Sequence, residues 1–419
     1  MNPIREGLKL RLEHTFRALK YKNYRYYFIG QGGSLVGTWM QRLAMWWLVY
    51  RLTGSEVMLG IVGFTSQIMT FLLSPLAGAY ADRHDPYKIF LLTQVIATLQ
   101  ALTLFSLVLF KVIAVWQIVV LSLILGFVNS FEMPARNSMV FYLVNDREDL
   151  PNAIALNSTL VNAARIIGPA IAGFLIALIG EGYCFLVNAI SYLIVIFALL
   201  AMTLDIRREF KKTKKIIHDI RDGLRYTFTH RTIRSVILNL AAVSLVGMSY
   251  MVIMPVYVHK VINSPSPKTL GFLMTATGVG AMMAGFFLAN KKRTEGFGRI
   301  VGIAPLFTGL SLIALSASRN VFVSLPLMFI LGAANMLIIA GSNTILQYSV
   351  ADEKRGRVMS IYTMAFIGMA PFGSLLYGYA AKMLSIKYAM ACFGFICMLI
   401  SFLYMNGNRH IGEASHEKE

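Results

Sequence analysis

The stretch YCFLVNAISYLIVIFALLAMTL, from Tyr183 to Leu204, decides the fold of this chain. It holds no charged side chain, and Asp205 follows it directly. A helix needs about 20 apolar residues to cross the hydrocarbon core of a bilayer. The stretch therefore predicts a helix that spans a membrane.

The rest of the chain repeats this pattern. Of its 419 residues, 57% are hydrophobic and only 14% are charged, and the mean hydropathy is +0.62. One water-soluble core cannot bury that much apolar surface, so lipid must be the solvent for most side chains. Apolar runs between charged breaks predict an all-α membrane protein with twelve spanning helices. We expect these helices at residues 28–49, 58–80, 87–110, 115–139, 153–179, 183–204, 235–258, 270–289, 300–317, 322–348, 358–381 and 388–405.

The basic residues are distributed unevenly between the loops. Lys and Arg number 39 against 20 acids, which gives a net charge of +19. Along the chain, 29 basic residues fall in one alternating set of loops and tails, seven in the opposite loops and three inside predicted helices. Positive charge is retained on the cytoplasmic side of a membrane. We therefore expect both termini in the cytoplasm, a location in the bacterial inner membrane, and no nucleic-acid partner.

The longest hydrophilic stretch divides the predicted helices into two sets of six. The expected organisation is a cytoplasmic segment at 1–27, a first six-helix half at 28–204, a basic linker at 205–234, a second half at 235–405 and a tail at 406–419. Within the linker, Ile216, Ile217, Ile220 and Leu224 recur at helical spacing beside a run of basic residues. This pattern predicts a helix that lies on an anionic membrane surface.

An internal repeat relates the two halves. Six residues of the first half recur in the second at one constant offset of 206. Gly126, Asn129, Asn137, Tyr142, Val144 and Asp146 match Gly332, Asn335, Asn343, Tyr348, Val350 and Asp352. A repeat of this kind predicts two parallel six-helix halves related by an axis along the membrane normal.

The loop after the second predicted helix reads GAYADRHDPYK, from Gly78 to Lys88. It resembles the cytoplasmic loop signature of the major facilitator superfamily, Gly-x-x-x-Asp-Arg-x-Gly-Arg-Arg. The resemblance implies a gating loop in which Gly78 allows close helix approach and Asp82 and Arg83 form polar contacts, with Lys88 beside them. Asp85 and Pro86 stand where the signature has Gly and Arg.

The fifth predicted helix carries ARIIGPAIAG, from Ala164 to Gly173. The run Gly168, Pro169 to Gly173 is similar to the Gly-Pro-x-x-Gly-Gly signature of proton-coupled exporters in the same superfamily, with Ala172 in place of one glycine. Proline removes a backbone hydrogen bond and glycine permits tight packing. We expect this segment to bend or to seal against the eighth helix through the small residues spaced from Gly280 to Gly285.

The resemblance extends over nearly the whole chain. It continues through GTWMQRLAMWWLVYRLTGS at 37–55, PARNSMVFYLV at 134–144, NAIALNS at 152–158 and RGRVMSIY at 355–362. These stretches are similar to enterobactin-type siderophore exporters and, more distantly, to macrolide efflux proteins. The resemblance implies the two-half major facilitator fold and secondary transport by alternating access.

Four charged residues are predicted inside spanning helices: Arg42, Glu132, Arg136 and Arg165. Charges at membrane depth cost about 2.5 to 3.5 kcal/mol or more, which makes each one a functional candidate. Glu132 and Arg136 are four residues apart and can pair, either for structure alone or as a proton-coupled switch. Arg42 could instead reach the headgroups, and Arg165 could bind substrate or lock the halves. Three arginines and one glutamate give this region a positive net charge, which favours an anionic substrate.

Neutral polar and aromatic residues have two possible roles each. Five polar residues inside the predicted helices can line a cavity or join helices. They are Gln67, Asn129, Asn335, Asn343 and Gln347. Four aromatic residues near the end of the first helix can line the site or form part of an interfacial belt, and the belt is the favoured interpretation. They are Trp39, Trp46, Trp47 and Tyr50.

The leading hypothesis is proton-coupled export of a small anionic metabolite such as a siderophore. The alternatives are efflux of amphipathic drugs, uptake of a siderophore, and a membrane scaffold without transport. We expect no enzymatic activity, cofactor or metal site, because the seven histidines are scattered, the three cysteines lie in or beside apolar runs, and no ATP-binding loop occurs. The expected partners are the lipid bilayer, protons, a small anion and export proteins in the periplasm or outer membrane.

Overall fold

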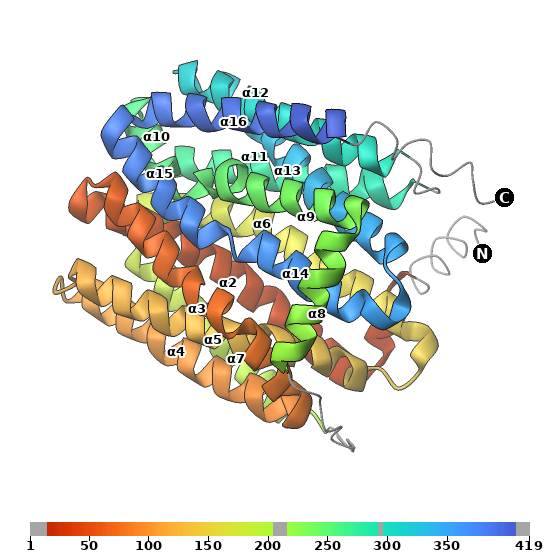
Figure 1. Cartoon of the computed structure of the whole chain (residues 1–419). Helices are drawn as coiled ribbons and strands as arrows, with labels where there is room; N and C mark the ends of the chain where they lie inside the picture. Colours follow the sequence, from red (N-terminus) through yellow and green to blue (C-terminus); the bar gives the residue numbers. More distant parts are fainter. Residues whose placement is uncertain (1–14, 204–215, 292–295, 408–419) are drawn as a thin grey trace, which may run out of the picture.

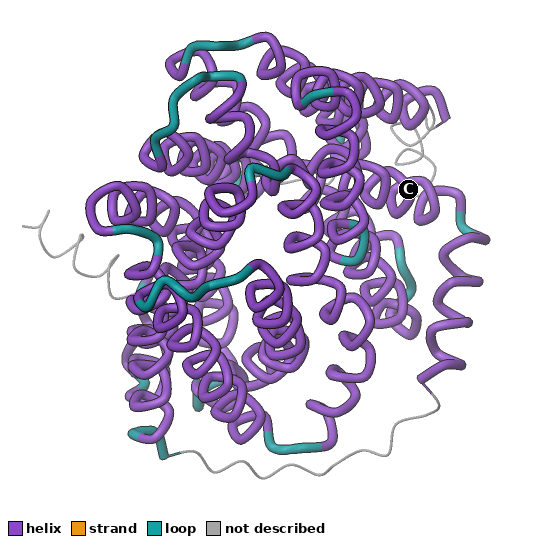
Figure 2. The backbone as a smooth tube through the Cα atoms, turned by 90° about the vertical axis from the view of Figure 1, so that its left-hand side faces the viewer, coloured by secondary structure: helices purple, strands orange, loops and turns teal. Residues whose placement is uncertain are grey.

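The computed structural model describes residues 15–203, 216–291 and 296–407. The side chains of Pro75, Ala79, Asp82, residues 216–221 and Glu353 lie outside this description. Within it the chain forms helices and connecting loops and no strand (Figure 2). The long helices run side by side as one bundle (Figure 1).

The first half contains six long helices, as expected. They are α2 (Lys22–Thr53), α3 (Glu56–Arg83), α4 (Pro86–Leu109), α5 (Val115–Leu143), α6 (Leu150–Ile179) and α7 (Gly182–Leu200). Two short 3-10 helices, η1 (Arg17–Lys20) and η2 (Arg147–Asp149), precede α2 and α6. Asp85 and Pro86, which depart from the loop signature, begin α4: the Asp85 side chain accepts a hydrogen bond from the backbone N–H of Tyr87 (2.9 Å), and Pro86 occupies the first turn.

The second half contains six further crossings. Four are continuous: α11 (Pro267–Ala289), α12 (Phe297–Ala317), α13 (Val321–Ser349) and α16 (Ile386–Gly407). Eleven helical segments of the described chain are long and apolar enough to cross a membrane. The more polar α2 is the twelfth, so the predicted number of spans is confirmed.

The seventh and eleventh crossings were expected to be continuous, and this is wrong. The seventh consists of α9 (Arg231–Val243), a π turn η3 (Ser244–Met248), a 3-10 turn η4 (Ser249–Ile253) and α10 (Met254–Lys260). The eleventh consists of α14 (Asp352–Ile367) and α15 (Ala370–Leu384). The two breaks lie against each other, because Ser244 donates to the carbonyl of Phe366 (2.5 Å) and Ser249 to that of Ala370 (3.3 Å). Serine hydroxyls thus satisfy backbone carbonyls beside the breaks.

The internal repeat is visible in the packing. A Cβ added to Gly126 of α5 would lie 2.9 Å from the carbonyl oxygen of Ser66 in α3. A Cβ added to Gly332 of α13 would lie 2.0 Å from the carbonyl oxygen of Thr277 in α11. The two equivalent glycines therefore make equivalent close helix contacts, as the internal repeat predicts.

One end of the bundle carries η1, α8 (Ile216–Thr229) and the connection between α5 and α6; we call it the terminal end, and the opposite end the far end (Figure 1). Asp149 binds Arg17 (3.0 Å) and Lys20 (2.6 Å) there. The hydrogen bond to Asp149 raises the pKa of Lys20 above its ordinary value. This contact ties the start of the described chain to the entrance of α6.

The linker helix α8 packs on the second half. Asp222 pairs with Arg357 of α14 (3.0 Å), and a Cβ added to Gly223 would lie 3.0 Å from the Cβ of Arg357. These contacts join the linker helix to the second half, and its position on the membrane surface stays a prediction. Residues 204–215 of the basic linker lie outside the described residues.

The buried cores show how the halves meet. One core contains side chains from both halves, such as Tyr50, Tyr257 and Tyr377, and it fills the far end. A second core contains residues of the second half alone, and a third contains residues of the first half alone, both toward the terminal end. The halves are therefore sealed to each other at the far end and separately packed at the terminal end.

Candidate substrate-binding site

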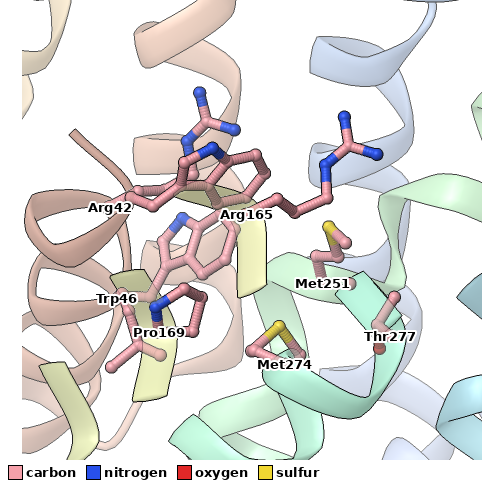
Figure 3. Close-up of a pocket in the computed structure, with 10 residues that line it drawn as sticks. Arg42, Trp46, Arg165, Pro169, Met251, Met274 and Thr277 are labelled. Carbon is pink, nitrogen blue, oxygen red and sulfur yellow. The ribbon is translucent and has the colours of Figure 1, made fainter. Parts of the chain in front are cut away.

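A pocket lies between the halves, where the shared core ends. It is formed by α2 and α6 of the first half and by η4 and α11 of the second (Figure 3). Its lining consists of Trp39, Arg42, Leu43, Trp46, Arg165, Pro169, Met251, Met274, Thr277 and Gly278.

Two arginines share one tryptophan in this pocket. The guanidinium carbon of Arg42 lies 4.7 Å from the ring centroid of Trp39, and that of Arg165 lies 5.5 Å from the same centroid. Cation–π contacts of this kind partly compensate a guanidinium that has left water. Within the described residues neither arginine pairs with an acid, and the Nε of Arg165 is buried without a hydrogen-bond partner. The pocket therefore holds two positive charges that the protein leaves uncompensated.

Arg42 lines the pocket, and its guanidinium group stacks on Trp39 inside the bundle. Its side chain remains exposed although its neighbours from Leu43 to Tyr50 are buried. Figure 3 shows the guanidinium groups of Arg42 and Arg165 on the same side of the pocket, with Met251, Met274 and Thr277 across from them. An accessible cation inside a bundle is the usual arrangement for a group that meets a polar ligand.

The glycines and proline of the fifth crossing position this pocket. A Cβ added to Gly168 would lie 2.5 Å from the Cβ of Trp39, so α6 lies directly on α2 at this level. Pro169 follows and lines the pocket. The close approach brings Arg165, one helical turn earlier on α6, to the ring of Trp39.

The seal between α6 and α11 was expected, and Gly173 takes part in it as expected, but the residues on α11 differ from the expected ones. Gly173 packs on Gly271, and Thr275 donates a hydrogen bond to the carbonyl of Ile166 (3.1 Å). Gly280 instead faces α13, because a Cβ there would lie 2.0 Å from the carbonyl oxygen of Phe329. The expected face of the eighth helix was wrong: several small-residue faces exist on it, and only packing selects one.

Glu132 and Arg136 form the pair that their spacing predicts. Arg136 donates to Glu132 across 3.2 Å, and both side chains are more than four-fifths buried. The Nε of Arg136 has no hydrogen-bond partner. Of the four charges predicted inside the membrane, two therefore pair with each other, and the other two belong to residues that line the pocket.

The five neutral polar candidates do not line this pocket. Asn335 accepts a hydrogen bond from Thr308 of α12 (3.3 Å), which joins two helices. Gln347 donates to Asn343 on its own helix (2.5 Å). Gln67 and Asn129 are half-buried. Joining helices is the role that the contacts of Asn335 support.

The interpretation of the aromatic residues as an interfacial belt was wrong. Trp46, Trp47 and Tyr50 are each less than 10% exposed and belong to the core shared by both halves. Trp39 and Trp46 line the pocket. Hydropathy could not separate these cases, because an aromatic residue near a helix end suits a headgroup region and a helix interface equally well.

Sequence reasoning missed a buried amide network. Asn188 of α7 donates to Gln41 of α2 (2.7 Å), and Gln41 donates to Gln100 of α4 (3.0 Å). All three residues are at most 3% exposed. It also missed Tyr250, a fully buried residue next to Met251 whose hydroxyl has no hydrogen-bond partner. The only signal for these residues in the sequence was that each is a polar residue inside an apolar run.

The predicted gating loop lies at the terminal end. Arg83 and Lys88 are exposed, and a Cβ added to Gly78 would meet no atom within 4 Å. The close helix approach expected at Gly78 is not made, because the halves are packed separately at this end. The side chain of Asp82 lies outside the described residues, so its gating role stays a prediction.

The far end is closed by polar and aromatic contacts between the halves. Lys260 of α10 donates to Glu56 of α3 (2.5 Å). The ring of His259 lies 5.5 Å from that of Trp47 and 5.2 Å from that of Tyr50. These contacts cover the shared core on the side away from the terminal end.

Comparison with known proteins agrees with this architecture. Residues 13–416 match the family described as transmembrane secretion effector. The chain is 26% identical to the staphyloferrin A transporter of Staphylococcus aureus, over 91% of this chain and 96% of that protein. It is 22% identical to macrolide efflux protein A of Streptococcus pyogenes, over 91% and 98%.

Solved structures share the fold at low identity. A bacterial homolog of the human lysosomal transporter Spinster, in an inward-facing and unoccupied conformation, superposes with a TM-score of 0.71 at 13% identity, covering 92% of this chain and 97% of that one. A bacterial homologue of the iron transporter ferroportin, in an inward-facing state, gives 0.68 at 15% identity, covering 91% and 98%.

Proposed function

This chain belongs to the transmembrane secretion effector family of the major facilitator superfamily, a family of multi-pass inner-membrane transporters, and from that membership we propose that it exports a small anionic metabolite such as a siderophore. Its relatives are transporters and not enzymes. The substrate, the direction and the coupling ion belong to the proposal.

The observation that carries the proposal is the pair of uncompensated arginines. Arg42 and Arg165 face one pocket between the halves, and no acid of the described chain pairs with either. A cation between membrane-spanning helices without an acidic partner is a favourable binding site for an anion. The pocket lies at the interface of the two halves, where transporters built from repeats bind their substrates.

The direction of access follows from the distribution of charge. The loops and tails predicted on one side hold most of the basic residues, which supports a cytoplasmic position for the terminal end. In the proposed orientation, the separate cores lie toward the cytoplasm and the shared core toward the periplasm, which corresponds to an inward-facing state. An exporter loads its substrate in this state, and alternating access requires the seal to move to the other end.

The pair of Glu132 and Arg136 is the proposed site of proton coupling. Protonation of Glu132 would remove the charge that holds Arg136 and free a guanidinium for an anionic group. Proton and substrate would then be linked through one local contact.

The second candidate function is efflux of amphipathic drugs. Two tryptophans and two methionines line the pocket, and such polarisable surfaces accept varied apolar molecules. The relationship to a macrolide efflux protein supports the same alternative.

A transport experiment separates the two functions. The purified protein is placed in proteoliposomes, and transport of citrate, 2,3-dihydroxybenzoate, erythromycin and ethidium is measured with and without an imposed pH gradient. We expect transport of the anions and its acceleration by the gradient. Transport of erythromycin or ethidium without the anions would establish the alternative.

A further inference from the structure

We propose that the ligand of the central pocket carries two separated carboxylate groups, one bound by Arg42 and the other by Arg165. The inference rests on the proposed function and narrows its substrate class from small anions to dicarboxylates and larger polycarboxylates. It stands on the position of the two guanidinium groups and on the charge around them.

The two guanidinium groups lie against the same tryptophan ring. Both lie against the ring of Trp39, at 4.7 and 5.5 Å from its centroid, so the two carbons are no farther apart than the sum of these distances. The position of Trp39 is itself fixed by the close contact with Gly168. Each guanidinium presents a planar fork of donors that matches one carboxylate in bidentate fashion. Two such forks on one ring favour a ligand whose two carboxylates can reach both of them.

The charges of Arg42 and Arg165 are both compensated only when the ligand supplies two carboxylates. A monocarboxylate would neutralise one arginine and leave the other cation inside the protein without a partner. Two separate monocarboxylates would repel each other and would each lose translational freedom on binding. One dicarboxylate compensates both cations in a single event, and Glu132 is not available to do so because it pairs with Arg136.

The second half contributes no charge to the lining. Its residues there are Met251, Met274, Thr277 and Gly278, with the buried hydroxyl of Tyr250 behind them. The charged groups of the ligand are thus bound by the first half alone, and the second half contacts the neutral part of the molecule. This division allows the halves to move against each other without breaking the charged contacts.

The test measures binding to the full-length protein in lipid nanodiscs by calorimetry. The probes are the linear dicarboxylates succinate, glutarate, adipate, pimelate and suberate, each with the monocarboxylate of equal chain length. We expect one dicarboxylate length to bind best, and to bind about tenfold or more tightly than its monocarboxylate, since one charge-assisted contact is commonly worth that factor.

The variants Arg42→Gln and Arg165→Gln should each reduce the affinity for the best dicarboxylate to that of a monocarboxylate. The double variant should bind neither. Arg319→Gln, an exposed arginine outside the pocket, is the matched control and should leave the ratio unchanged. If a glutamine variant is not monodisperse, Arg42→Lys and Arg165→Lys keep the charge but lose the fork, and the same loss of preference for the dicarboxylate is expected.

Two results would overturn the inference. Equal affinity for dicarboxylates and monocarboxylates of every length would do so, as would an unchanged preference in both arginine variants. Transport of monocarboxylates that depends on the arginines would leave the proposed function standing and remove only the dicarboxylate claim. If the protein transports erythromycin or ethidium but no anion, both the proposed function and the dicarboxylate inference are wrong.

Discussion

Gly173 of α6 and Gly271 of α11 lie in direct backbone contact, since a Cβ added to either one would be 3.0 Å from the Cα of the other. Gly60 of α3 and Gly378 of α15 make the equivalent contact on the other side of the interface. Both contacts join the two halves at the far end. Closure of that end therefore depends on the absence of side chains at four positions.

The first prediction concerns this contact. Gly173→Val should disfavour the state that is closed at the far end, because the added side chain has no space beside Gly271. Thiol labelling of a cysteine introduced at Tyr257, in the shared core, should become faster in this variant. Gly33→Ala, at an exposed helical position where a Cβ meets no atom within 4 Å, is the control. Equal labelling of both variants would show that the glycine contact does not control closure.

The second prediction concerns the ion pair at the far end. Glu56→Gln should weaken closure there, because Lys260 loses its acidic partner between the halves. The exchange Glu56→Lys with Lys260→Glu should restore closure, and each single charge change should not. Labelling of the same introduced cysteine measures the effect. If the effect of the double change on the labelling rate equals the sum of the effects of the two single changes, the two residues do not act as a pair.

The third prediction concerns proton coupling. Glu132→Gln should fold and bind anions but lose the acceleration of transport by a pH gradient, since it cannot exchange a proton. Arg136→Ala should lose affinity for anionic ligands selectively. Transport in proteoliposomes with and without an imposed gradient is the measurement, after both variants are shown to be monodisperse. Normal gradient-driven transport by Glu132→Gln would return the pair to a structural role.

The fourth prediction concerns the amide network. Asn188→Ala should destabilise the first half by about 1–3 kcal/mol, because it leaves the buried carbonyl group of Gln41 without its donor. Thermal unfolding in detergent is the measurement. Asn290→Ala is the control, as this exposed amide bonds only to its own helix. An equal effect of the two substitutions would show that the network adds no stability.

The fifth prediction concerns orientation. Reporters fused after residue 419 or inserted in the linker at 205–234 should give cytoplasmic signals, because the basic loops lie at the terminal end. A reporter inserted in the α10–α11 loop at residue 264 should give a periplasmic signal. The opposite pattern would reverse the direction of access that we propose.

The sequence by itself determined the features that depend on neighbours along the chain. The number of spans follows from apolar runs, because a bilayer imposes a minimum length on every crossing helix. The pairing of Glu132 with Arg136 follows from helical spacing, since residues four apart lie on one face. The repeat predicted the equivalence of Gly126 and Gly332 for the same reason: equal local patterns make equal helices.

Only the tertiary structure decided the features that join distant segments. Arg42 and Arg165 are each recognisable as costly charges in a sequence, but their meeting at Trp39 depends on how α6 crosses α2 at Gly168. The breaks at Ser244 and Ser249 likewise require the partner carbonyls of the eleventh crossing. Hydropathy reports how a residue partitions between water and lipid. It does not report which of several apolar faces two helices will share, because lipid and protein interior are nearly equivalent solvents for those faces and only close packing and polar contacts distinguish them.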